Sequence, residues 1–114
     1  RLFDAAAFFV ALPVRRQHRV RIRAKRLRYA LDLFASTLPE KRTRRYVERL
    51  AHLQDELGAL NDAVVAGGLL RRLSRAAGVD PLPAGEWLQR QRERHALRAE
   101  QALADLLRRP VPWG

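Results

Sequence analysis

Apolar side chains recur along the middle of the chain at alternating spacings of four and three residues. The pattern is formed by Tyr46, Leu50, Leu53, Leu57, Leu60 and Val64. This spacing keeps one face of an α-helix apolar, and it passes through Gly58 without a change of phase. We therefore predict one long helix over residues 40–75, with any bend at Gly58 or at residues 67–68.

The rest of the chain also has helical patterns, separated by proline and glycine. We predict a buried first helix over residues 2–12, a basic helix over 14–37 and a last helix over 84–108. The last helix is expected to direct six side chains into the core: Trp87, Leu88, Leu97, Leu103, Leu106 and Leu107. No run alternates with a period of two, which disfavours strands. The expected fold is all-α, an antiparallel bundle of about four helices in a single domain over residues 1–114.

The basic helix concentrates positive charge. Between Arg15 and Arg28 stand eight of the chain's 23 Lys and Arg residues, with one histidine and no acid. Like charges on neighbouring turns repel, so this density indicates an external anion that stabilises it. At about 100° per residue, an apolar stripe forms from Val20, Ala24, Leu27, Leu31, Phe34 and Leu38. A cationic stripe, here named the basic ladder, is expected roughly opposite and consists of His18, Arg21, Lys25 and Arg28.

A second cationic stripe repeats the spacing of the basic ladder on the next helix. It consists of Arg42, Arg45, Arg49 and His52. In an antiparallel hairpin this stripe is placed to border the basic ladder and to extend an anion-binding surface. A solvated charged flank is the alternative, and the spacing alone does not separate the two.

Composition narrows the class of partner. The formal net charge of +11 and the pI of about 11.6 favour nucleic acid, acidic lipid or polyphosphate. A hydrophobic content of 47% excludes a disordered tail, and the absence of cysteine excludes disulfides and thiolate metal sites. The longest apolar run, residues 5–12, is too short to span a bilayer. Because the chain begins with arginine, we expect it to be a piece of a longer gene product.

Two long segments of the chain resemble the CHAD family, the conserved histidine α-helical domain. They are HRVRIRAKRLRYALDLF at residues 18–34 and LAHLQDELGALNDAVVA at 50–66, and the PVPW ending is also similar. The resemblance implies an all-α domain of two similar bundles, of which this chain corresponds to the C-terminal half. It also implies non-enzymatic binding of inorganic polyphosphate, in the cytoplasm at polyphosphate granules. It implies no cofactor and no metal.

The resemblance also assigns site residues. The family's basic positions fall on the ladder, His18, Arg21, Lys25 and Arg28, with Arg19 and Arg26 beside it. Asp55 and Asp62, in the second segment, are expected to orient an arginine of the basic helix, such as Arg23 or Arg26. Ordinary solvation of the helix surface is the alternative for these two acids.

Other functions compete with polyphosphate binding. Non-specific binding of a nucleic-acid backbone is the main rival, although only Tyr29 lies near the ladder to stack on bases. A histidine phosphotransfer-type role for His18 ranks lower, and a metal site lowest, because no second ligand stands three or four residues away. The sequence has no nucleophile–base pair, glycine-rich phosphate loop or carboxylate dyad typical of an enzyme. We expect the chain either to form a homodimer or to pack on a separate N-terminal bundle.

Overall fold

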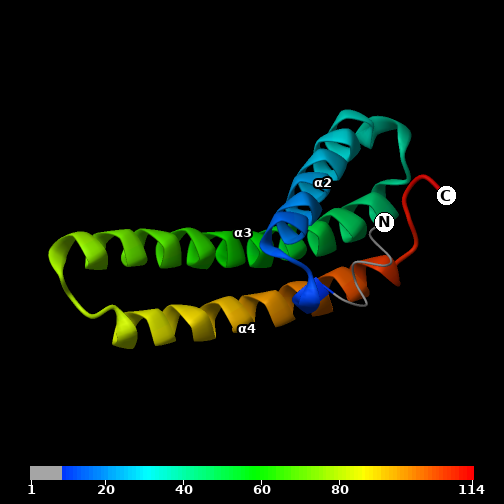
Figure 1. Ribbon diagram of the computed structural model, residues 1–114. Helices are drawn as coiled ribbons and strands as arrows, with labels where there is room; N and C mark the ends of the chain where they lie inside the picture. Colours follow the sequence, from blue (N-terminus) through cyan, green and yellow to red (C-terminus); the bar gives the residue numbers. More distant parts are fainter. Residues whose placement is uncertain (1–8) are drawn as a thin grey trace.

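A computed structural model describes residues 9–114, and within this range the chain contains helices and no strand (Figure 1). Three α-helices dominate: α2 (Val14–Leu33), α3 (Glu40–Ala77) and α4 (Leu82–Leu107). Short 3-10 turns precede and follow α2, as η1 (Phe9–Ala11) and η2 (Ala35–Thr37). The predicted all-α class is confirmed, with three α-helices packed together in the described range instead of about four. Most of the expected first helix lies outside the described residues, and its last part is η1.

The helices α3 and α4 form a long antiparallel hairpin, and α2 lies across one half of it (Figure 1). With 38 residues, α3 is about 57 Å long at 1.5 Å per residue. That length accounts for the longest dimension of the molecule, 57 Å. The prediction of one long helix through Gly58 is confirmed, and α3 ends at Gly78. There the backbone takes a left-handed φ of 67°, which glycine adopts without a steric penalty.

The hydrophobic core lies where α2 crosses the hairpin. The leucine pattern of α3 is buried as predicted, with Leu50, Leu53 and Leu57 at most 2% exposed. The other helices contribute Val20, Ala24 and Leu31 from α2, and Ala96, Ala99, Ala102, Leu103 and Leu106 from α4. The alanines let the backbone of α4 approach closely, while the leucines supply most of the buried apolar area.

Both ends of the described chain contact the core helices, through packing and hydrogen bonds. Phe9 is fully buried, and its carbonyl oxygen accepts a hydrogen bond of 3.0 Å from the Gln17 side chain. The next residue, Val10, donates its backbone N–H to Glu100 on α4 at 2.8 Å. At the other end, the Trp113 ring stands edge-on to Tyr46, with 5.7 Å between ring centroids. The C-terminal tail therefore returns to the beginning of α3.

Some apolar positions differ from the prediction. The basic helix ends at Leu33, so Phe34 is 59% exposed instead of buried. The Phe34 carbonyl accepts a hydrogen bond of 2.8 Å from the Thr37 hydroxyl in the turn that replaces the last part of the helix. On α4, Trp87 and Leu97 are 54% and 50% exposed and do not reach the core. At about 100° per residue, both point away from the face that carries Leu103.

Candidate anion-binding site

The basic ladder lies on one flank of α2, at the edge of the core. His18 and Lys25 are exposed, whereas Arg21 and Arg28 are half-buried. The expectation that the ladder stands roughly opposite the core therefore fits His18 and Lys25 and is wrong for Arg21 and Arg28. Arg21 and Arg28 each follow a core residue by one position, which turns them about 100° from the core and toward α3.

Two neutral amides of α3 face the ladder. Arg28 donates a hydrogen bond from Nη1 to Oε1 of Gln54, at 3.3 Å. Asn61 lies beside the first turns of α2, where it lines one small hollow between the helices together with His18 and Arg21. Gln54 and Asn61 are seven residues apart, so they lie on the same side of α3. The flank between the two helices therefore combines cationic side chains with amide groups that carry no charge.

The hollow beside His18 is shallow, with a volume of about 20 Å³. Its floor is apolar and is formed by Leu57, Leu60 and Val64. This volume holds about one water molecule and cannot enclose a phosphate group. An anion at the ladder therefore lies along an open surface, which suits an extended polyanion better than a small enclosed ligand.

The charges of the ladder are not neutralised within the described range. Among residues 9–114, the ion pairs involve none of the four ladder residues. Asp55 and Asp62 are exposed and form no ion pair in this range, so their expected pairing with Arg23 or Arg26 is wrong. Asp55 directly follows Gln54, and Asp62 directly follows Asn61. Each carboxylate is therefore rotated by about 100° around the axis of α3, away from α2.

The outer surface of α2 carries further cations and an aromatic ring. Arg19 and Arg26 are exposed there. Tyr29 is 59% exposed, and the ammonium nitrogen of Lys25 lies 5.9 Å from its ring centroid. This distance permits a cation–π interaction, which is weak at an exposed site.

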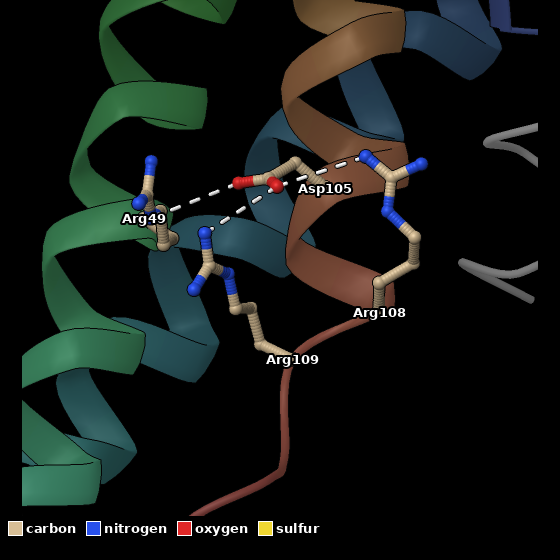
Figure 2. Close-up of polar contacts among 4 residues, drawn as sticks. All are labelled: Arg49, Asp105, Arg108 and Arg109. Atoms are coloured by element: carbon tan, nitrogen blue, oxygen red, sulfur yellow. Dashed lines mark ion pairs between the residues drawn. The ribbon is translucent and has the colours of Figure 1, made fainter.

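The second cationic stripe lies on a different flank of α3. Arg49 Nε is 3.7 Å from Oδ2 of Asp105 on α4 (Figure 2). Arg42 and Arg45 share a hollow with Arg109, which follows α4. The stripe therefore borders α4 and the C-terminal tail, and the expectation that it borders the basic ladder is wrong. The reason is that α4, and not α2, runs along this flank of α3.

Sequence reasoning missed several polar residues between the helices. Gln54 and Asn61 each follow a buried leucine of α3 by one position. Their position next to these leucines in the sequence could have indicated that both amides lie at the edge of the core, beside α2. Glu56 and His95 were also missed: His95 Nδ1 lies 2.9 Å from Oε1 of Glu56, which is 9% exposed. These two are 39 residues apart, so only the tertiary packing of α3 against α4 brings them together.

In the described part of the chain, no group of three or more His, Cys, Asp or Glu residues is arranged to hold a metal ion. Between residues 9 and 114, no helix combines the length and the hydrophobicity needed to cross a membrane.

Comparison with protein-family models gives a match to the CHAD domain over residues 1–71. The match includes both of the segments that carry the resemblance. It ends within α3, so it does not include the PVPW ending that also resembles the family. Neither the curated proteins nor the solved structures include a match to this chain.

Proposed function

The chain belongs to the CHAD domain family, and on that premise we propose that it binds inorganic polyphosphate along the basic ladder of α2. The observation that supports this proposal most strongly is the uncompensated charge of the ladder. Its cationic side chains extend over about 15 Å of helix, from His18 to Arg28, and no acid among residues 9–114 pairs with them. We propose a binding role and no catalytic one.

Polyphosphate matches this surface in its chemistry. Each internal phosphate carries about one negative charge and offers oxygen acceptors, with no base or sugar to recognise. The planar guanidinium groups of Arg21 and Arg28 bind two oxygens at once, while Lys25 acts as a mobile point charge. Because the ladder is an open surface, successive phosphates lie along it without entering a cavity. Release of counterions then supplies much of the affinity, as it does for nucleic-acid backbones.

The amides of α3 have a supporting role in this proposal. Gln54 accepts a hydrogen bond from Arg28, which holds that guanidinium beside α3. A glutamate at the same place would neutralise the arginine, whereas the amide orients it and leaves its charge available. The proposed binding surface also includes Arg19 and Arg26 on α2. The three arginines of the second stripe, Arg42, Arg45 and Arg49, belong to the proposal as a separate surface, because they lie beside α4.

Binding of a nucleic-acid backbone is the second candidate, and the position of Tyr29 favours it. An exposed aromatic ring next to a cationic ladder is a platform on which a base of a single strand stacks. One such ring is a small platform compared with the full ladder of charges, so polyphosphate remains the preferred ligand.

A competition titration distinguishes the two candidates. Fluorescently labelled long-chain polyphosphate is bound to the protein and displaced by unlabelled polyphosphate, orthophosphate, single-stranded DNA or duplex DNA, all at the same ionic strength. We expect polyphosphate to displace the probe at the lowest concentration of phosphate groups, and orthophosphate at the highest. Equal or stronger displacement by either DNA would contradict the proposal.

A further inference from the structure

A single carboxylate on α4 lies among three arginines. Asp105 Oδ2 is 3.7 Å from Arg49 Nε, and Oδ1 is 3.7 Å from Arg108 and 3.6 Å from Arg109 (Figure 2). Arg49 comes from α3, whereas the two other arginines follow Asp105 in the chain. In Figure 2 the Arg49 and Arg109 side chains approach the carboxylate from the α3 side, and Arg108 approaches it from the other side.

These contacts leave the arginines able to bind another anion. Separations of 3.6–3.7 Å are longer than a hydrogen bond, so the carboxylate attracts the guanidinium groups without engaging their N–H donors. One negative charge also cannot neutralise three positive charges. The Arg49 side chain is 48% exposed, so its remaining donors face solvent.

Hollows on both sides of Asp105 extend this positive region. Toward the beginning of α3, a hollow of about 510 Å³ is lined by Lys41, Arg42, Arg45 and Arg109, with Glu40 as its acid. Toward the middle of α3, a hollow of about 360 Å³ is lined by Arg49, His52 and Arg98, with Glu56 and Asp105 as its acids. Glu56 is engaged by His95, whose Nδ1 lies 2.9 Å from Oε1 of the carboxylate. We name this region the α3/α4 groove, defined by Arg42, Arg45, Arg49, His52, Arg98 and Arg109.

The α3/α4 groove and the basic ladder lie on different flanks of α3. Gln54 faces the ladder and Arg49 faces the groove, and five residues of helix separate them, a rotation of about 140°. A helix with its side chains is about 10–12 Å across. A short anion in the groove therefore does not reach the ladder.

We propose that the α3/α4 groove is a second polyphosphate-binding site, and that the protein therefore joins two polyphosphate chains. The proposal rests on the proposed function for the class of ligand, and it combines the arginines of the second stripe on α3 with Arg98 and Arg109 into one site that shares no residue with the basic ladder. Asp105 lowers the positive charge of the groove, since its carboxylate lies among Arg49, Arg108 and Arg109. Bivalency of this kind condenses long polyphosphate by cross-linking it, with no contact between protein molecules.

The experiment is a calorimetric titration of the whole 114-residue chain with tripolyphosphate, a chain too short to occupy both surfaces. Three triple variants each remove three positive charges. The groove variant carries Arg45→Ala, Arg49→Ala and Arg98→Ala, and the ladder variant carries Arg21→Ala, Lys25→Ala and Arg28→Ala. The charge-matched control carries Arg72→Ala, Arg75→Ala and Arg90→Ala, at exposed positions outside both sites. Far-UV circular dichroism checks that each variant is folded.

We expect two tripolyphosphates per chain for the parent and the control, and one for each of the other variants. Two sites in the folded groove variant, or a single parental site that only the ladder variant abolishes, would overturn the second site and leave polyphosphate binding by the basic ladder standing. Two sites in the folded ladder variant, with one lost in the groove variant, would support the groove and overturn the ladder.

Two further measurements test the parts of the proposal. Asp105→Asn removes the negative charge within the groove, and we expect it to strengthen tripolyphosphate binding there several-fold. Unchanged or weaker binding in this folded variant would contradict the site.

With long-chain polyphosphate, light scattering is expected to fall at least threefold in the groove variant relative to the charge-matched control. Equal scattering by these two proteins would contradict cross-linking through the groove.

Discussion

Arg28 donates a hydrogen bond to Gln54 across the contact between α2 and α3, with 3.3 Å between Nη1 and Oε1. A cationic group of the ladder is thereby held by a neutral partner on the neighbouring helix. We expect Gln54→Glu to weaken polyphosphate binding about tenfold, or about 1.4 kcal/mol, because the new carboxylate neutralises Arg28 and repels the ligand. The dissociation constant measured by calorimetry checks this. Ala84→Glu adds the same charge at an exposed position in the first turn of α4, and it is expected to change the affinity less than twofold.

Removal of the ladder is expected to weaken binding without unfolding the protein. Alanine at Arg21, Lys25 and Arg28 relieves mutual repulsion on α2, so the helix content stays the same. We expect at least a tenfold loss of affinity for long-chain polyphosphate. The slope of log affinity against log salt is expected to become less steep by roughly 2–3, about one for each lost phosphate contact. A folded variant with the parental slope would show that the ladder does not contact the ligand.

The contribution of His18 is expected to depend on pH. A protonated imidazole donates from both nitrogens and attracts a phosphate, whereas the neutral ring lacks the charge. Binding is therefore expected to be stronger at about pH 5.5 than at about pH 8. His18→Gln is expected to reduce this dependence and to leave the salt dependence nearly unchanged.

Tyr46 makes the stability of the fold sensitive to alkaline pH. Burial raises the pKa of Tyr46 above its usual value of 10.0, because desolvation penalises the phenolate. The unfolded chain then ionises first as the pH rises. The stabilisation is fully present below pH 10 and is lost progressively between the unfolded and folded pKa values. Urea unfolding between pH 8 and pH 11 checks this, and Tyr46→Phe is expected to flatten the decline. An equally steep decline in the phenylalanine variant would assign the effect to other groups.

The contact between Glu56 and His95 is expected to stabilise the α3–α4 pair. Glu56 is 9% exposed and accepts a hydrogen bond of 2.9 Å from His95 Nδ1. Removal of one partner leaves the other half-buried without a partner, so Glu56→Ala is expected to lower the free energy of unfolding by about 1–3 kcal/mol. Glu56→Gln keeps an acceptor oxygen and is expected to cost less than half as much. Denaturant unfolding at pH 7 measures both, and equal losses would indicate that the charge and not the hydrogen bond matters.

Helical periodicity predicted most of the fold. The leucines of α3 and the apolar positions Val20, Ala24 and Leu31 of α2 are buried as their spacing indicates. The prediction failed at Phe34 and Trp87. A regular pattern does not show where a helix ends, and Phe34 falls just after the end of α2. Trp87 is out of phase with the core face of α4, since it points away from the side that carries Leu103.

The candidate site was predicted less completely. The ladder could be identified from one helix, because its four residues share one stripe of α2. Its neighbours depend on which flank of α3 each helix occupies, and a sequence pattern does not specify this. Packing of α4 along the second stripe therefore separated Arg49 from the ladder and placed it beside Asp105. The same packing placed the neutral Gln54, and not Asp55 next to it, against Arg28.

The half of the α3–α4 hairpin that extends past α2 has a consequence for the dynamics of the molecule. In this half, α3 offers Gly67 and a half-buried Leu70 to α4, while Leu69 and Leu73 are 46% and 58% exposed. Less apolar surface is therefore exposed to water when the end of the hairpin opens than when the core unfolds. Backbone amides of residues 64–77 are expected to exchange with deuterium by local fraying, and those of residues 46–60 only when the whole core unfolds. A single helix, α3, thus passes from a slowly exchanging segment to a rapidly exchanging one along its own length.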